Sequence, residues 1–370
     1  FLGLRQSKQI VEDDVDDEDC EDERILEGIE REYELKPIEG KMHRNLCECA
    51  RPHTRVDIVS VIRSSGKRTL YVDRQLSSKA SETDVAAAEN DLKMMCYLST
   101  LHGSLGKHGH PNIIELLGYF THVNSLHIIA KYYELGNLMT MLDTAAKLKE
   151  ANDKTLPHFR TDKSIRALIR DIFQGVAFIH RSGVAHLDLA LENIYIGLDG
   201  QFRVGDFRHA RFVGSANRYQ AAPPPVRKVY AAPELHSGRE IDLLKTDAWS
   251  LGVIVLMVLT METPFTEATI RDPKYQRLQL WGLSKLLEGL ISKCELKIPI
   301  PKDMRNLLAG LLCCNPEHRT SVLRSVEMYS WLQASDGQIP VTEASTDNSA
   351  TNSSSSCNTQ TQSNEVEQEQ

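Results

Sequence analysis

The sequence predicts an α+β protein of two lobes, in which a small β-rich lobe with one main helix precedes a large helical lobe. Apolar and polar residues alternate between Arg55 and Leu76, as they do in half-buried strands. After Gly136 the apolar residues recur at helical spacing instead. The apolar share of 41% and the charged share of 25% are those of an ordinary globular domain.

The first lobe is expected to contain strands, one helix and further strands. A β-hairpin is predicted from Arg55 to Leu76, with its turn at Ser64-Ser65-Gly66-Lys67. Ser81-Glu82-Thr83-Asp84 is similar to a capping box and predicts the start of a helix, which the following apolar periodicity supports. Two more strands are predicted at Pro111 to Ile114 and at Leu126 to Ala130.

The second lobe is expected to be mainly helical. One long helix is predicted to end at His180-Arg181-Ser182-Gly183, where glycine follows the last periodic residues. Its apolar face consists of Ile165, Leu168, Ile169, Ile172, Phe173, Val176 and Ile179. Trp249 to Leu259 and Met304 to Cys314 predict two further helices.

The two ends of the chain differ in composition from its body. The net charge of -8 and the pI near 5.9 argue against nucleic acid as a partner, since phosphate binding needs a basic surface. Much of the negative charge lies between Val11 and Glu39, and this stretch is expected to be disordered. Ser345 to Gln370 is rich in polar residues and is expected to be disordered too. We therefore predict tails at residues 1–45 and 335–370 around a domain at 46–334, divided into a small lobe (46–130), a connection (131–136) and a large lobe (137–334).

Eight scattered cysteines indicate reduced thiols and a cytoplasmic protein. Cys47-x-Cys49, with His43 and His53 beside it, is the cluster that could ligate zinc, although its spacing is not that of a standard finger. No apolar stretch approaches the length of a membrane-spanning helix, so none is expected. Because the chain begins at Phe1, one alternative is that Phe1 to Leu4 ends a truncated spanning helix of a receptor.

Two motifs carry the functional prediction. Residues 186–193 read His-Leu-Asp-Leu-Ala-Leu-Glu-Asn, and Asp206-Phe207-Arg208 follows after a short strand-like run. The pair resembles the catalytic loop and the metal motif of protein kinases, His-Arg-Asp-x-x-x-x-Asn and Asp-Phe-Gly. The resemblance implies that Asp188 and Asn193 are catalytic, with Asp188 as the base that accepts a substrate hydroxyl proton. It also implies that Asn193 and Asp206 bind Mg²⁺ and that the cofactors are ATP and Mg²⁺.

The resemblance to protein kinases covers about Val56 to Leu332 and implies the two-lobed protein-kinase-like fold. Residues 131–134 fall at the hinge, where backbone groups would bond adenine, and Ala130 falls at the small gatekeeper position. Glu89 falls at the glutamate of the small-lobe helix, and Tyr195 falls at the floor of the adenine pocket. The cofactor-binding residues that the resemblance implies are therefore Ala130, Tyr132, Tyr133, Tyr195 and Glu89.

Three further matches have structural roles in the family. Ala232-Pro233-Glu234 resembles the motif that ends the activation segment, and Arg319 would pair with Glu234. Asp247 would bind the backbone of the catalytic loop. These matches favour the fold and say nothing about activity.

The residues that should grip the phosphates of ATP do not match the family. A kinase covers the phosphates with a glycine-rich loop, because only bare backbone comes close enough. The stretch from Lys41 to Ser65 contains no glycine. The family also grips the phosphates with a lysine on a strand, which one kinase family supplies from a neighbouring strand; here Lys67 or Arg63 could substitute for it in that way.

The strand lysine of the family is also missing. Asp73 falls at its position, where a carboxylate would face both the phosphates and Glu89. Opposed like charges in a partly dry cleft would weaken binding. If the register moves by one residue, Arg74 could pair with Glu89 instead.

Departures continue in and after the catalytic loop. Ala190 replaces the lysine of serine/threonine kinases, and Glu192 stands where tyrosine kinases carry an arginine. Leu187 removes the arginine that holds an activation-loop phosphate. Arg208 replaces the hinge glycine and puts a cation beside the metal site, while the ring of Tyr195 would crowd adenine.

The resemblance and its gaps lead to two hypotheses. The first is a protein-kinase-fold protein with impaired or absent phosphotransfer, a pseudokinase that signals by binding protein partners and by conformational control. The alternative is an active, divergent, ATP-dependent kinase, serine/threonine-directed, that transfers the γ-phosphate to a protein hydroxyl. A membrane is expected as a partner only if the chain is a receptor fragment.

Overall fold

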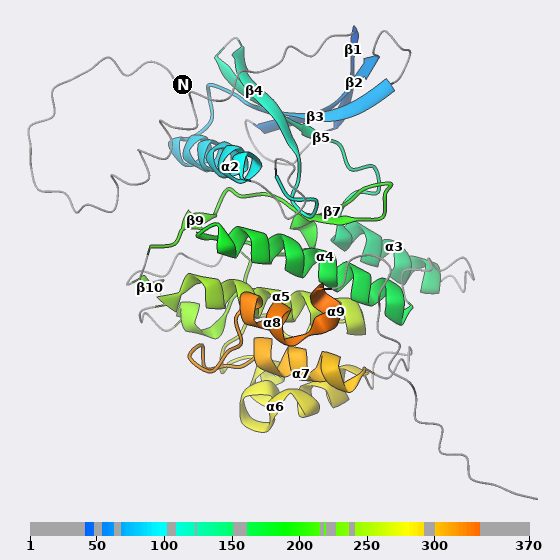
Figure 1. Ribbon diagram of the computed structural model, residues 1–370, viewed down its shortest axis with the longest axis vertical. Coiled ribbons are helices and arrows are strands. Elements are labelled where there is room, and N and C mark those ends of the chain that lie inside the picture. Colours follow the sequence, from blue (N-terminus) through cyan, green and yellow to red (C-terminus); the bar gives the residue numbers. More distant parts are fainter. Residues whose placement is uncertain are drawn as a thin grey trace, which may run out of the picture.

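The computed structural model describes residues 41–47, 54–62, 68–101, 109–122, 124–150, 161–214, 218–219, 227–236, 241–291 and 300–333. Within these ranges a small lobe of strands with one long helix stands above a larger helical lobe (Figure 1). The predicted α+β class and its two lobes are confirmed.

The small lobe is built on a five-stranded antiparallel sheet with strand order β1-β2-β3-β5-β4. The predicted hairpin is confirmed, because Thr54 of one strand lies opposite Leu76 of the next. The first strand begins at Lys41, ahead of the predicted domain start at Leu46, and pairs with its neighbour from that residue onward. The strands are β1 (Lys41–Cys47), β2 (Thr54–Ile62), β3 (Arg68–Leu76), β4 (Leu116–His122) and β5 (Ser125–Lys131).

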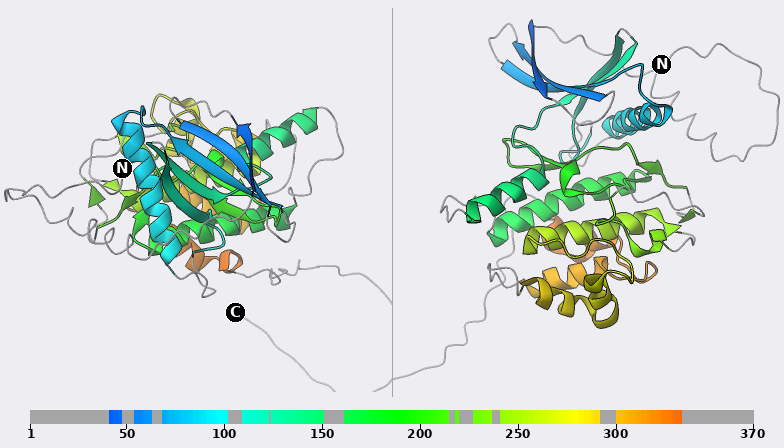
Figure 2. Two further views of the ribbon diagram at one scale, coloured as in Figure 1. Left: turned by 90° about the horizontal axis from the view of Figure 1, so that it is seen from above. Right: turned by 180° about the vertical axis from the view of Figure 1, so that it is seen from behind.

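Helix α2 (Glu82–Thr100) lies beside this sheet (Figure 2). It begins where the capping pattern predicts, because Ser81 Oγ accepts a hydrogen bond from the Asp84 backbone N–H at 3.2 Å. Its apolar face is buried at Ala88, Leu92 and Met95. The periodicity of the sequence therefore placed the one main helix of the small lobe.

The predicted strand at Pro111 to Ile114 is wrong. This segment is a turn that is held against the large lobe, and strand β4 starts only at Leu116. The Asn112 side-chain amide donates to Phe202 O at 3.0 Å, and the Asn112 carbonyl accepts from Val204 N at 2.9 Å. A Cβ added at Gly175 would lie 2.6 Å from the Asn112 carbonyl oxygen. These contacts with distant residues override the local preference for a strand.

The large lobe consists of helices with short strands between them. The predicted long helix is α4, and Thr161 caps it by accepting from Ser164 N at 3.1 Å. The helix predicted to reach Cys314 ends at Leu311. The helices are α3 (Leu138–Glu150), α4 (Asp162–Arg181), α5 (Leu243–Thr260), α6 (Pro273–Ile291), α7 (Lys302–Leu311), α8 (Val322–Met328) and α9 (Ser330–Gln333), with 3₁₀ turns η2 (Leu191–Asn193) and η3 (Pro233–His236). The short strands are β6 (Val184–Ala185), β7 (Ile194–Ile196), β8 (Phe202–Val204), β9 (Arg211–Phe212), β10 (Arg218–Tyr219) and β11 (Ile241–Asp242).

Helix α5 is the central helix of the large lobe. By length and composition it could cross a membrane, contrary to the expectation that no stretch is long enough. However, 78% of its residues are buried inside the protein, and Trp249 is fully buried among them. Such burial is that of a core helix.

A buried ion pair joins the end of the activation segment to the base of the large lobe, as the sequence predicted. Arg319 donates to both carboxylate oxygens of Glu234, at 2.5 and 2.8 Å. Its Nε also donates to Cys313 O at 2.9 Å, and its guanidinium lies over the Trp249 ring at 5.0 Å. The arginine side chain is 0% exposed, so its charge depends entirely on these partners.

We expect Arg319→Met to lower the free energy of unfolding by about 3–5 kcal/mol, because it leaves the Glu234 charge buried and unpaired. Arg324→Met is the matched control, since Arg324 and Glu327 form an exposed pair at 3.3 Å. The control should change stability by less than about 0.5 kcal/mol in urea unfolding. Equal losses in the two variants would show that the buried pair does not support the lobe.

His110, before the turn at Asn112, gives the fold a pH dependence. Burial, with a smaller contribution from Arg181, lowers the pKa of His110 to about 4 from an ordinary value near 6.5. The unfolded chain therefore binds this proton first, and stability should fall as the pH drops from about 6.5 to about 4. His110 Nδ1 accepts from the Asn112 backbone N–H at 3.2 Å, and His110→Asn keeps an acceptor there. The free energy of unfolding of this variant should vary less with pH over that window. If the stability of the variant falls with pH as steeply as that of the wild type, His110 is not the origin of the pH dependence.

Candidate active site

The loop that carries Asp188 is shaped by a single buried carboxylate. Asp247, on α5, accepts hydrogen bonds from His186 N at 2.7 Å and Leu187 N at 2.8 Å. Its Oδ2 also lies 2.9 Å from His180 Nε2. These bonds hold Leu187 at a φ of 61°, a left-handed conformation that a leucine rarely adopts. The predicted role of Asp247 in binding the loop backbone is confirmed.

Asp188 and Asn193 lie together at the end of this loop, as the motif predicts. The Asn193 amide donates to the Asp188 carbonyl at 2.8 Å and to Asp188 Oδ2 at 3.0 Å. Asp188 is 5% exposed and Asn193 is 3% exposed. The asparagine therefore orients the carboxylate, whose role as a base stays a prediction.

Arg227 of the activation segment forms an ion pair with the Asp188 carboxylate. Its Nη1 donates to Asp188 Oδ2, and its Nε lies 3.6 Å from Glu192 Oε1. Burial opposes the arginine charge, but the hydrogen bond and the charge of Asp188 more than offset it, so the pKa of Arg227 lies above its ordinary value. No local pattern in the sequence predicts this contact, because it depends on the chain returning to the loop.

Arg208 likewise forms an ion pair with the carboxylate of Asp206. Its Nε donates to Asp206 Oδ1 at 2.5 Å and its Nη2 donates to Asp206 Oδ2, so the contact is bidentate. Asp206 has a φ of 69°, a left-handed conformation that aspartate tolerates better than most residues. The predicted cation beside the metal site is thus bound to the predicted metal ligand itself.

The cation on the central strand is Arg74, and its partner is Asp91 on α2. Arg74 Nη1 donates to Asp91 Oδ2, and Asp91 is fully buried. Asp91 is the main cause that raises the pKa of Arg74 above its ordinary value, and Asp206 and Tyr195 add to the effect. The predicted pairing with Glu89 is wrong: residues two positions apart on a helix point in nearly opposite directions, so the acid that faces Arg74 is Asp91.

Asp73 does not face the cleft, which corrects the prediction that a carboxylate replaces the strand lysine. Its side chain lies on the other face of the sheet, since successive strand residues alternate. There it is fully buried, with His127 Nδ1 at 3.0 Å and Gln75 Nε2 at 3.0 Å. The register shifted by one residue, with Arg74 at the lysine position, is the correct one.

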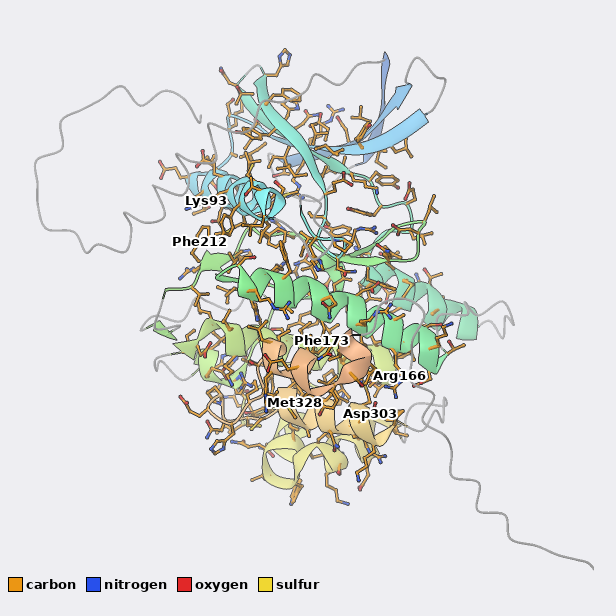
Figure 3. All side chains as sticks on the ribbon, viewed as in Figure 1. Lys93, Arg166, Phe173, Phe212, Asp303 and Met328 are labelled. Carbon is orange, nitrogen blue, oxygen red and sulfur yellow. The ribbon has the colours of Figure 1, made fainter. Side chains whose placement is uncertain are left out.

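Helix α2 also holds the start of the activation segment. Asp91 Oδ1 accepts a hydrogen bond from Phe207 N at 2.7 Å. The Asn90 amide donates to three backbone carbonyls, those of Phe207 and Arg208 at 3.1 Å and that of Ala210 at 2.9 Å. Further along α2, Lys93 Nζ lies 5.4 Å from the centre of the Phe212 ring (Figure 3). Asn90 and Asp91 were not among the predicted site residues, although they follow the expected glutamate directly.

The residues predicted to bind adenine line the connection between the lobes. Tyr133 is buried, and its hydroxyl accepts from Glu115 N at 3.0 Å. Burial raises the pKa of Tyr133 to about 12. The Tyr133 and Tyr195 rings lie 6.1 Å apart, while Ala130 is buried on β5 and Tyr132 is half-buried. The Tyr133 side chain thus supports the hinge, and an adenine contact by any of these residues stays a prediction.

Several predictions lie outside the described residues. These are the loop between β1 and β2, the substitutes Lys67 and Arg63 for the strand lysine, and the cluster of Cys49 and His53 with the side chains of Cys47 and His43. In the part of the chain that the structure describes, no group of three or more His, Cys, Asp or Glu side chains is arranged to hold a metal ion.

The contacts of Asp206 do not fit Mg²⁺. This ion takes carboxylate oxygens into a nearly ideal octahedron, but Arg208 already holds both oxygens of Asp206. The Asn193 amide nitrogen is turned toward Asp188, so its Oδ1, the atom that could ligate a metal, is not the obstacle. A metal would have to displace a guanidinium from a carboxylate that is 8% exposed.

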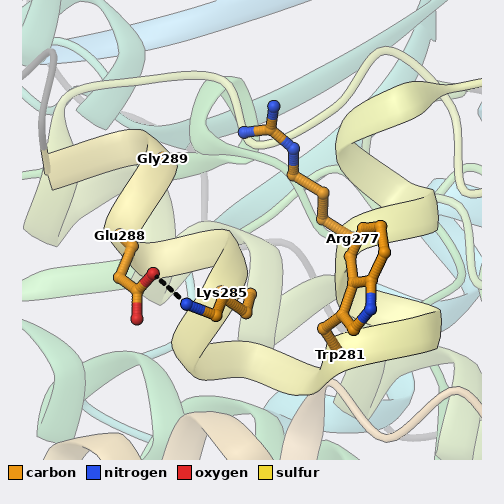
Figure 4. Close-up of a pocket in the computed structure, with 5 residues that line it drawn as sticks. All are labelled: Arg277, Trp281, Lys285, Glu288 and Gly289. Carbon is orange, nitrogen blue, oxygen red and sulfur yellow. Dashed lines mark hydrogen bonds and ion pairs between the residues drawn. The ribbon is translucent and has the colours of Figure 1, made fainter.

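A surface pocket of about 330 Å³ lies elsewhere, on α6. It is lined by Arg277, Trp281, Lys285, Glu288 and Gly289, with Lys285 donating to Glu288 at 2.7 Å (Figure 4). Helix α6 lies at the far end of the large lobe from the sheet (Figure 1). The pocket therefore has no part in the chemistry of the cleft.

Comparisons with known proteins agree with this geometry. The chain is 28% identical over 225 residues to an Aurora kinase of Schizosaccharomyces pombe, covering 60% of this chain and 55% of that protein. It is 26% identical over 228 residues to the serine/threonine-protein kinase kin-29 of Caenorhabditis briggsae, covering 60% of this chain and 24% of that protein. The chain thus spans about half or less of these relatives. Because the model of the protein kinase domain also matches residues 78–332, this chain belongs to the protein kinase domain family.

Proposed function

We propose that this protein is a pseudokinase, a kinase-domain protein whose phosphotransfer is impaired or absent and which signals by binding protein partners. One observation carries the proposal: arginines of the chain itself hold both Asp188 and Asp206. These are the two carboxylates on which phosphoryl transfer in the family depends.

The first obstacle to transfer is at Asp188. A general base must lie within hydrogen-bonding distance of the hydroxyl whose proton it accepts. Oδ2 of Asp188 already accepts from both Asn193 and Arg227. At Oδ2 a substrate hydroxyl would therefore compete with a charged donor that is itself more than half buried, its side chain being 24% exposed.

The second obstacle is at Asp206, whose contact with Arg208 takes the oxygens that a metal needs. Removal of one group that stabilises charge in a transition state typically lowers a rate by orders of magnitude. The family's loop lysine is absent at Ala190 too. Several such losses together support weak or absent transfer.

The described residues also give no support for conformational control by a phosphate on the activation segment. Leu187 stands where the family's phosphate-binding arginine would be, and it packs on an apolar cluster of Ala185, Ile241 and Leu243. Meanwhile Asn90 and Asp91 already hold the start of the segment. We propose a preformed binding surface in a cytoplasmic protein, where Cys96, Cys313 and Cys314 stay free thiols.

The proposal is tested by phosphate transfer from radiolabelled Mg·ATP to general protein substrates. We expect the full chain to transfer no more than its Asp188→Asn variant, because the base is already occupied. Circular dichroism of both proteins serves as the folding control. Robust transfer that disappears in Asp188→Asn would overturn the proposal.

An active, divergent kinase is the second candidate, and the pair of Arg74 and Asp91 favours it. This pair keeps a cation on β3 and an acid on α2, the arrangement that grips phosphates in active kinases. The relatives named above are kinases, one of them a serine/threonine-protein kinase. Under this alternative, Arg208 and Arg227 would leave their carboxylates when nucleotide and substrate bind.

In both candidates Asp91 holds the cation on β3. We expect Asp91→Asn to lower the free energy of unfolding by about 2–4 kcal/mol, because it removes the charge that faces Arg74. Glu89→Gln, on the same helix, is the matched control and should cost less than about 0.5 kcal/mol. Urea unfolding of both variants shows which acid pairs with Arg74. An equal or larger loss of stability in Glu89→Gln would indicate Glu89 as the partner.

A further inference from the structure

Three guanidinium groups gather around Asp206, in the space between the lobes that is called the cleft here. Arg74 and Arg227 both interact electrostatically with Asp206, and Arg208 contacts it directly. Their side chains are 23%, 24% and 17% exposed, so each reaches solvent from a largely buried position. The three come from β3, from the residues just after Asp206 and from the end of the activation segment.

Each arginine neutralises one carboxylate. Arg74 pairs with Asp91, Arg208 with Asp206 and Arg227 with Asp188. Without these partners the carboxylates would repel a phosphate chain. With them, a phosphate meets neutral ion pairs whose cations still carry hydrogen-bond donors.

Arg208 has donors to spare. Its contact with Asp206 uses Nε–H and one N–H of Nη2, which lie on one edge of the planar group. The N–H groups of Nη1 lie on the other side, and among the described residues they donate to no acceptor. A guanidinium in this position can join the carboxylate to a phosphate oxygen, which is the bridging role that a metal has in active kinases.

We infer that the cleft binds the phosphate chain of a nucleoside triphosphate without a divalent metal, with Arg208 bridging Asp206 and the phosphates. Arg74, on β3, and Arg227, near the end of the activation segment, contribute further donors. This inference rests on the proposed function, because it concerns the same cleft in a protein that does not transfer phosphate.

Phosphate binding through Arg208 would separate this domain from an active kinase in its response to Mg²⁺. Mg²⁺ bound to a triphosphate cancels part of its charge, which weakens its attraction to arginines. The metal also gains no ligand at Asp206 unless Arg208 leaves. Added Mg²⁺ should therefore fail to strengthen nucleotide binding.

The test is isothermal titration of the full 370-residue chain with ATP, in EDTA and in excess Mg²⁺. We expect binding in EDTA with a Kd equal to or lower than that in Mg²⁺. Adenosine, which lacks phosphates, is the control ligand and should bind at least about tenfold more weakly. Binding that requires Mg²⁺, equally tight binding of adenosine, or no binding of ATP in either condition would overturn the inference.

Variants of the bridging arginine sharpen the test. Arg208→Ala should weaken binding in EDTA by about tenfold or more, because it removes a charge-assisted contact. Arg211→Ala is the matched control, since Arg211 is an exposed arginine in the same segment, and it should change the Kd by less than about twofold. If Arg208→Ala does not fold, Arg208→Lys keeps the charge without the bidentate edge and should also weaken binding. Unchanged binding in a folded Arg208 variant would contradict the bridge.

The two proposals can fail separately. Phosphate transfer in the Mg²⁺ sample would overturn the pseudokinase proposal. Binding that depends on Mg²⁺ without transfer would overturn the bridge alone and leave the pseudokinase proposal standing.

Discussion

The charge balance of buried carboxylates is the constraint on which the cleft depends. Asp91, Asp188 and Asp206 are each less than a tenth exposed, and an isolated carboxylate in such a place costs several kcal/mol. Active kinases meet that cost with lysines and metal ions. This domain meets it with Arg74, Arg227 and Arg208, all within the chain. A cation that is covalently part of the protein is always present, so the pairs form without any ligand.

Hydrogen bonds from helix α2 also tie the two lobes together. Asp91 binds β3 through Arg74 and the activation segment through Phe207 N, so one side chain joins three elements. Asn90 adds three bonds to the same stretch of backbone. In the large lobe, Asp247 and the pair of Glu234 and Arg319 fix the loop and the end of the segment. A cleft framed in this way suits a protein that presents one conformation to its partners.

The sequence predicts best those residues whose roles follow from a local motif. Asp247 and the partner of Glu234 were found because their neighbours in the chain match a motif over several positions. Arg74 was assigned correctly only as an alternative, since a strand with a period of two turns a one-residue error into the opposite face. Asp91 was not predicted, because Glu89 matches the residue type of the family. The side chain that faces Arg74 is set by the direction of the helix, which residue type does not record.

The contacts of Arg227 and Asn112 are beyond local reasoning. Arg227 meets a carboxylate 39 residues away, and Asn112 meets a carbonyl 90 residues away. Both contacts form only after distant parts of the chain have packed, so no periodicity records them. In the case of Asn112 that packing replaced a predicted strand with a turn.

Electron paramagnetic resonance of Mn²⁺ tests most directly whether the arginines stand in for the metal. Mn²⁺ prefers the same oxygen ligands and octahedral geometry as Mg²⁺, so it reports on that site. Titrated into the full chain without nucleotide, Mn²⁺ should show only the spectrum of the free ion, while Arg208→Gly should give a protein-bound signal. A bound signal in the wild type that disappears in Asp206→Asn would contradict the account.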